Sequence, residues 1–226
     1  MAHVIFVHGA WVGPDSWDRV APLVEQAGHT TEAVALPLTS VANDVAIATE
    51  AIERAGTDVI LVGHSYGGTV ITAAGVGQAQ VQHLVYVAAV ANDQGESANN
   101  LVARFPTTPA GPYIQVDGQS RMTIQRDRFP DLFAQDVDAA VAADLAQRQH
   151  PTSTACFGDA LAVVPAWRDH PTTFLISTED RVVSPLLQAW EAGRMGAMTL
   201  PLASSHASPV SHPREIADAI TAIRSR

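Results

Sequence analysis

The stretch DVILVGHSYGGTVITAAGVG, residues 58–77, passes from an apolar run, through three glycines around one serine, into small residues that favour a helix. Within it, residues 63–67 (GHSYG) fit the pattern G-x-S-x-G. Where this pattern joins a buried strand to a helix, the serine occupies a strained turn and its hydroxyl points outward. Small neighbours then let the strand and the helix approach closely. The motif therefore predicts that Ser65 is a nucleophile rather than part of an ordinary glycine-rich turn.

The rest of the chain alternates strand and helix patterns around this motif. Apolar runs predict strands at 3–9, 31–36, 58–64, 81–90, 172–178 and 197–202, and amphipathic patterns predict helices at about 16–27, 41–55, 66–77, 185–193 and 213–223. Continuous apolar strands separated by single helices predict an α/β fold whose mainly parallel sheet carries helices on both faces. Ligands bind such sheets beyond the carboxyl ends of the strands.

The alternation breaks at residues 92–165. This part contains turn-rich stretches and short helical pieces such as 136–149, but no buried-strand run of the earlier kind. We therefore expect one core formed by residues 1–91 and 166–226. We expect residues 92–165, called the cap below, to form a small inserted helical cap over the active site.

Composition excludes several classes of function. The chain has 226 residues, of which 47% are hydrophobic, which is enough for one substantial core. Its 13 basic and 23 acidic residues give a formal charge of −10, which argues against nucleic acid and anionic membranes as partners. The absence of lysine excludes Schiff-base chemistry and a P-loop lysine. No apolar run approaches the ~20 residues that a membrane helix needs.

Cysteine usage and the first residues favour a cytoplasmic location. Cys156 is the sole cysteine and cannot form an internal disulfide. The first residues, MAHVIFVHGAW, lead directly into a predicted strand without a basic leader. A reducing compartment is therefore expected.

A serine nucleophile requires a histidine base and a carboxylate, in the chain order serine, acid, histidine for this architecture. His206 lies in the loop ASSHASP directly after the last predicted strand, whereas His212 immediately precedes the proline that opens the last helix. His206 is the predicted base. Two adjacent carboxylates, Glu179 and Asp180, end the penultimate strand, and the shorter Asp180 is the predicted acid. Asp93, which also follows a strand, stays as a second candidate.

Two backbone N–H groups should also meet the negative oxygen that develops during acyl transfer. One belongs to the residue after the nucleophile, and the other to the loop after the first core strand. These residues are Tyr66 and Ala10.

Together, the segments HGAW (8–11), GHSYGG (63–68), TEDRVVSP (178–185) and SSHASPVSHPREIADAI (204–220) resemble the α/β-hydrolase superfamily. More narrowly, they resemble its small-cap branch of plant methylesterases, hydroxynitrile lyases and bacterial esterases. The resemblance covers residues 3–90 and 172–224. It implies a triad of Ser65, Asp180 and His206, an oxyanion hole at Ala10 and Tyr66, and no cofactor; we also expect no metal. It further implies that the cap shapes the substrate pocket.

The sequence indicates which residues could line the substrate pocket. Apolar and aromatic side chains of the cap, together with one beside the oxyanion loop, are candidate pocket walls: Trp11, Phe105, Tyr113, Ile114, Phe129, Leu132, Phe133 and Phe157. Core packing explains each of them equally well. The lack of a dense basic cluster favours a small, mostly apolar ester over a polyanion. Four arginines could still hold a carboxylate, namely Arg104, Arg121, Arg126 and Arg128.

Three functions fit these residues: a serine esterase, a carbon–carbon lyase with the same triad, and a non-catalytic ligand receptor. The resemblance implies that the lyases carry threonine after the oxyanion-loop histidine and lysine after the catalytic histidine. Those positions are Gly9 and Ala207 here, so ester hydrolysis through an acyl-enzyme is favoured. A receptor would not need both the nucleophile and the histidine. Whether the chain forms a homodimer stays open.

Overall fold

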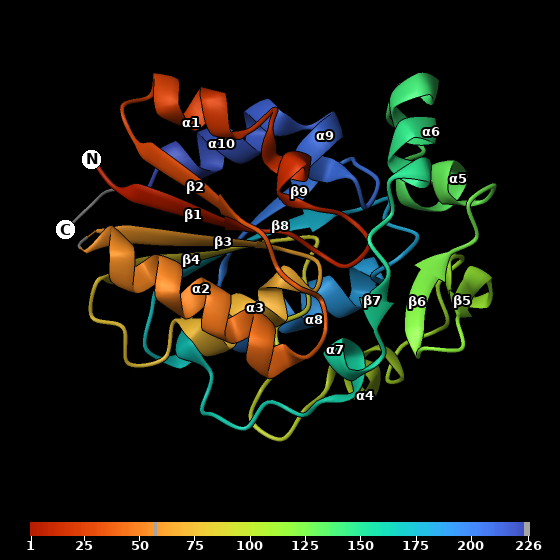
Figure 1. Ribbon diagram of the computed structural model, residues 1–226. Coiled ribbons are helices and arrows are strands. Elements are labelled where there is room, and N and C mark those ends of the chain that lie inside the picture. The colour runs from red at the N-terminus through yellow and green to blue at the C-terminus, as the bar shows by residue number, and fades with distance from the viewer. Residues whose placement is uncertain (57, 224–226) are drawn as a thin grey trace.

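The computed structural model describes residues 1–56 and 58–223. A six-stranded parallel sheet lies at its centre, in the order β2-β1-β3-β4-β8-β9 (Figure 1). Its strands are β1 (His3–Val7), β2 (Thr30–Val34), β3 (Val59–His64), β4 (Val81–Val87), β8 (Thr172–Ser177) and β9 (Met198–Leu202). The predicted α/β fold with a parallel sheet is confirmed.

Helices cover both faces of the sheet because successive strand residues point to opposite sides. In β1, Val4 and Phe6 belong to one apolar cluster and Ile5 and Val7 to the other. Figure 1 shows α1 (Ala21–Gln26), α9 (Ser208–Ser211) and α10 (Pro213–Thr221) over one face. It shows α2 (Val41–Ala55), α3 (Gly67–Ala74) and α8 (Pro185–Met195) over the other.

The helix expected at 16–27 is shorter than predicted. A 3₁₀ helix, η1 (Pro14–Trp17), comes first, and α1 begins only at Ala21. Pro22 lies in the first turn of α1. Proline lacks an N–H group and is tolerated there but not in a helix interior, which explains why one continuous helix does not form.

The cap lies beyond the carboxyl ends of the strands, at the end of the molecule opposite the N-terminus (Figure 1). Its elements are α4 (Ala98–Val102), η2 (Gly111–Tyr113), β5 (Ile114–Val116), β6 (Arg121–Ile124), α5 (Phe129–Phe133), α6 (Ala139–Gln147), β7 (Thr152–Ser153) and α7 (Ala155–Gly158); η3 (Ala166–Arg168) follows it. The expected helices are present, but β5, β6 and β7 add an antiparallel sheet that was not predicted. These strands have two to four residues and only Ile124 and Thr152 among them are buried, so they carry no buried apolar run.

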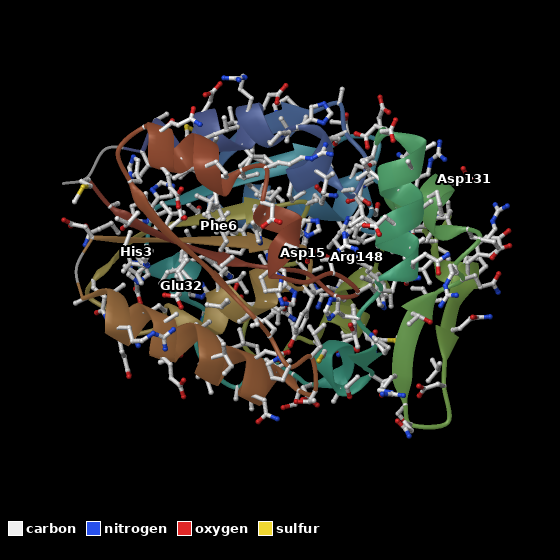
Figure 2. The ribbon with its side chains drawn as sticks, turned by 45° about the horizontal axis from the view of Figure 1, so that its top comes forward. His3, Phe6, Asp15, Glu32, Asp131 and Arg148 are labelled. Atoms are coloured by element: carbon white, nitrogen blue, oxygen red, sulfur yellow. The ribbon has the colours of Figure 1, made fainter. Side chains whose placement is uncertain are left out.

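Two sets of contacts fasten the cap to the core. Asp15, on η1, and Arg148, at the end of α6, form an ion pair and lie side by side in Figure 2. Trp11 donates its backbone N–H to Thr152 Oγ1 (3.2 Å) and its indole N–H to the carbonyl oxygen of Met122 (3.0 Å). The loop after β1 is therefore built against the small sheet of the cap.

Candidate active site

Ser65 occupies a sharp turn between β3 and α3. Its φ is 53°, in the left-handed region that non-glycine residues rarely adopt. A Cβ atom on Gly63 would lie 2.6 Å from the carbonyl oxygen of Gly67, and one on Gly67 would lie 2.4 Å from that of Val7. Both positions need glycine because the backbones of strand and helix nearly touch. The turn has the strained geometry that the motif predicts.

The structure brings together the three residues that the sequence singled out. His206 Nε2 lies 2.9 Å from Ser65 Oγ, and His206 Nδ1 lies 2.7 Å from Asp180 Oδ2. All three residues are buried. Because the carboxylate can only accept a hydrogen bond, the proton is assigned to Nδ1, which leaves Nε2 to accept the serine hydroxyl.

The carboxylate of Asp180 is fixed by further donors. Its Oδ1 accepts from the backbone N–H groups of Val182 (2.7 Å) and Val183 (2.9 Å). Its Oδ2 accepts from Gln188 Nε2 (2.9 Å) as well as from His206. These bonds hold the carboxylate in one orientation toward the imidazole.

The alternative residues lie elsewhere. Asp93 forms an ion pair with Arg168 (2.5 Å), so it does not orient His206. His212 lies 3.6 Å from Asp136 and does not approach the nucleophile. Glu179 is exposed, although it neighbours Asp180.

The peptide group between Ser65 and Tyr66 has a fixed orientation. The carbonyl oxygen of Ser65 accepts hydrogen bonds from the N–H groups of Gly68 (2.9 Å) and Val90 (3.1 Å). Because a trans peptide is planar, its N–H points away from its carbonyl. The Tyr66 N–H is thus aimed away from those two donors, and it has no hydrogen-bond partner among the described residues.

A similar arrangement fixes the peptide between Gly9 and Ala10. His8 donates its Nδ1–H to the carbonyl oxygen of Gly9 (2.8 Å), and its Nε2 accepts from the N–H of Leu36 (3.0 Å), which sets the tautomer. Burial lowers the pKa of His8 to about 4, so the ring stays neutral at neutral pH. The N–H of Ala10 points away from the fixed carbonyl and has no partner within 1–56 and 58–223.

A second neutral histidine supports the base. His64, the variable residue of the motif, donates Nε2–H to the carbonyl oxygen of His206 (2.8 Å). Burial and the neighbouring His206 hold the pKa of His64 well below its usual range. His64 therefore acts as a hydrogen-bond donor to the loop that carries the base. Its place between Gly63 and Ser65, the variable position of the motif, favours such a structural hydrogen bond over proton transfer.

A cavity of about 410 Å³ opens beside Ser65. Among the predicted wall residues, Trp11, Phe105, Ile114 and Phe157 line it. The other apolar side chains around it are Val90, Ala98, Val102, Ala103, Met122, Val182 and Val183, and the polar ones are Asn99, Thr107 and Thr108. No charged side chain of the described residues lines this cavity.

Four other predicted wall residues do not line this cavity, namely Tyr113, Phe129, Leu132 and Phe133. Phe129 and Phe133 stack on each other with ring centroids 4.5 Å apart, and the edge of Phe133 packs against the His206 ring. Tyr113 lies under the Arg128 guanidinium at 4.7 Å. These aromatic residues pack the cap against the core because their elements turn them inward. Sequence alone cannot separate a ring that seals an insertion from one that faces a ligand.

Val182 and Val183 are among the wall residues that the sequence analysis did not single out. They follow Asp180 in the turn after β8, at the carboxyl end of the sheet where ligands bind. That position is the signal that could have identified them.

The four arginines considered for a carboxylate do not reach the cavity. Arg104 pairs with Glu96 (2.9 Å) and Arg121 with Asp117 (3.0 Å). Arg128 lies over Tyr113, and Arg126 is exposed. The cavity wall thus offers no cation to an anionic substrate.

The described residues contain neither a metal-binding cluster nor a membrane-spanning helix. Within 1–56 and 58–223, no group of three or more histidine, cysteine or acidic side chains is placed to hold a metal ion. In the same ranges, no helix has the length and apolarity needed to cross a bilayer.

A model of the alpha/beta hydrolase family matches residues 4–219. The chain belongs to this family. It is an enzyme of the alpha/beta-hydrolase type. The resemblance drawn from the sequence motifs is thereby confirmed.

Proteins similar in sequence to this alpha/beta hydrolase include another hydrolase, an esterase and a lyase. It is 26% identical over 207 residues to the alpha/beta hydrolase nvfD of Aspergillus novofumigatus, covering 82% of this chain and 80% of that one. It is 34% identical over 119 residues to a carbendazim hydrolyzing esterase of Nocardioides sp., covering 47% and 48%. It is 28% identical over 123 residues to an alpha-hydroxynitrile lyase of Arabidopsis thaliana, covering 48% of each.

Among solved structures, a pyrethroid hydrolase from Sphingobium faniae has a similar fold. The TM-score is 0.81 at 22% identity, covering 97% of this chain and 95% of that one.

Proposed function

We propose that this alpha/beta hydrolase cleaves small, neutral, mostly apolar carboxylic esters, with Ser65 as nucleophile, His206 as general base and Asp180 as the orienting acid. The observation that carries the proposal is the continuous hydrogen-bonded chain from Asp180 through His206 to Ser65, which opens onto an apolar cavity. The esterase among its relatives supports the same reaction class.

The geometry accommodates each step of acyl transfer. Ser65 Oγ attacks the ester carbonyl carbon while His206 Nε2 takes its proton. The N–H groups of Ala10 and Tyr66 are the donors to the resulting oxyanion. The tetrahedral species then collapses, the alcohol leaves with the proton from His206, and the acyl group stays on Ser65. A water activated by His206 cleaves this acyl-enzyme, which releases the acid and restores the serine.

The cavity supports a neutral substrate. Desolvating a carboxylate without a partner is costly, and the wall supplies no cation to compensate. Its polar side chains, Asn99, Thr107 and Thr108, lie among apolar ones. An ester whose acyl and alcohol groups are uncharged fits such a wall best.

The proposal includes a cytoplasmic location and leaves room for a homodimer. Cys156 is buried and free, which suits a reducing compartment. Cell fractionation tests the location, and analytical ultracentrifugation tests the assembly.

The nucleophile is tested by labelling. Treatment with a fluorophosphonate should attach one label per chain, and peptide mapping should place it on Ser65. Ser65→Ala should abolish both the label and the turnover of p-nitrophenyl esters. A panel of acyl chain lengths, run beside aryl methyl esters and monoesters of dicarboxylic acids, should show preference for the neutral substrates. Labelling at another residue, or full activity in Ser65→Ala, would overturn the assignment.

A further inference from the structure

A buried contact links the residue after the nucleophile to helix α2. The Tyr66 hydroxyl donates to Asp44 Oδ2 at 2.7 Å, and both residues are almost inaccessible to solvent. Asp44 Oδ1 accepts the N–H of Leu38 (2.9 Å), and the Cys156 thiol approaches Oδ2 at 3.6 Å. Buried carboxylates are costly without partners, so a carboxylate retained here with three donors indicates a specific role.

The Tyr66 ring is held on its face as well as at its hydroxyl. Its centroid lies 5.8 Å from that of Phe157, which also stacks on Trp11 at 5.9 Å. Phe157 and Cys156 both belong to α7 of the cap. The side chain of Tyr66 is thus fixed between α2 of the core and α7 of the cap.

The fixed Tyr66 ring restrains the backbone conformation of the same residue. The preceding residue, Ser65, has a left-handed conformation, which persists only where its surroundings hold it. The carbonyl side of the 65–66 peptide is held by Gly68 and Val90. On the other side, the carbonyl oxygen of Tyr66 accepts the N–H of Val70 (3.3 Å). The Tyr66 side chain adds to this restraint, because a ring fixed at both its hydroxyl and its face limits χ1 and the backbone angles compatible with it.

We propose that Asp44 is a positioning residue for the oxyanion hole: its hydrogen bond to the Tyr66 hydroxyl keeps the Tyr66 N–H aimed at the developing negative oxygen. This inference rests on the proposed function, because it assumes that the Tyr66 N–H meets the substrate oxygen. Asp44 itself touches neither the substrate nor Ser65.

Tyr66→Phe and Asp44→Asn test the role, with Tyr86→Phe as the matched control. Tyr86 is equally buried and its hydroxyl pairs with Thr72 (2.9 Å), but it lies in the core and does not line the cavity. Removing an oxyanion donor costs ~10²–10³-fold in kcat, so a misaimed donor should cost about tenfold. We expect kcat per labelled active site to fall about tenfold in both test variants with little change in KM, and to stay unchanged in Tyr86→Phe.

Two further readouts separate positioning from simple destabilisation. The inhibition constant of a trifluoromethyl ketone, whose adduct with serine mimics the oxyanion, should rise by the same factor as kcat falls. The double variant Tyr66→Phe/Asp44→Asn should lose no more kcat than Tyr66→Phe alone, because each single change already removes the same hydrogen bond. Unchanged kcat per labelled site, unchanged inhibitor affinity or additive losses would each overturn the inference.

One readout does not depend on turnover. The amide ¹H–¹⁵N signal of Tyr66 should shift in Asp44→Asn and stay in place in Tyr86→Phe. A Tyr66 signal that is unmoved in Asp44→Asn contradicts the positioning role even if no ester is hydrolysed. Conversely, absence of labelling and turnover in the wild type would refute the proposed function and leave this measurement to decide the role of Asp44.

Discussion

His64 and His206 are neighbours with ring centroids 4.8 Å apart, yet only His206 reaches Ser65. His64 instead donates Nε2–H to the backbone carbonyl of His206. Because burial keeps His64 neutral, it adds no positive charge beside the imidazolium that forms on His206 during acyl transfer. In the proposed reaction His206 exchanges protons with the substrate, whereas His64 holds the loop that carries His206 in place.

This division of roles predicts a graded response at position 64. His64→Leu removes the donor to the His206 loop and should lower kcat about tenfold, whereas His64→Gln, whose amide can donate, should retain more activity. Steady-state kinetics on p-nitrophenyl acetate test this ranking, and an equal loss of kcat in His64→Leu and His64→Gln would contradict it.

The carboxylate of Asp180 should be indispensable for the rate. Asp180→Asn leaves a group of the same shape but presents an amide to His206 Nδ1, which favours the wrong tautomer. In Ser-His-Asp enzymes such a change costs ~10⁴-fold in kcat, and we expect a loss of that order. Glu179→Gln, one position away and exposed, is the matched control and should behave like the wild type. Retained activity in Asp180→Asn, measured on p-nitrophenyl acetate, would refute the assignment.

Cyanohydrin cleavage should be absent despite the similarity to a hydroxynitrile lyase. A Cβ on Gly9 would lie 2.7 Å from Ser65 Cβ, so this position has no room for a side chain that binds a substrate hydroxyl. Ala207, after the base, carries no charge for a departing cyanide. We expect no enzyme-dependent cyanide release from mandelonitrile or acetone cyanohydrin. Release that disappears in Ser65→Ala, without turnover of any ester, would favour the lyase.

Because of Glu191, the free energy of unfolding should decrease as the pH rises. It is buried, accepts the N–H of Ala91 (3.0 Å), and burial raises its pKa from 4.5 to about 8. Between these values the folded state keeps the proton and the unfolded state does not, so the free energy of unfolding decreases with pH, at most by about 1.4 kcal/mol per unit. Glu191→Gln should flatten this decline between pH 5 and 8 in urea titrations. Parallel pH curves for the two proteins would show that Glu191 does not titrate in this range.

Sequence alone determined the features that depend on local pattern. Apolar runs located the six strands of the sheet. Burial on both faces gives β1, β3, β4 and β8 a continuous apolar signal, whereas the edge strands β2 and β9 are more exposed. The elbow motif and the chain order identified Ser65, Asp180 and His206, because each follows a strand whose carboxyl end must lie at one edge of the sheet.

Tertiary structure alone decided the features that depend on long-range packing. The strands of the cap are too short to carry a periodic signal, and whether Phe105 or Phe133 faces the cavity depends on how the cap turns against the core. The contacts of Asp44 with Tyr66 and of His64 with the His206 carbonyl join residues 22 and 142 positions apart. No local pattern records such pairs, because their hydrogen bonds form only when the sheet has brought α2, the elbow and the histidine loop together.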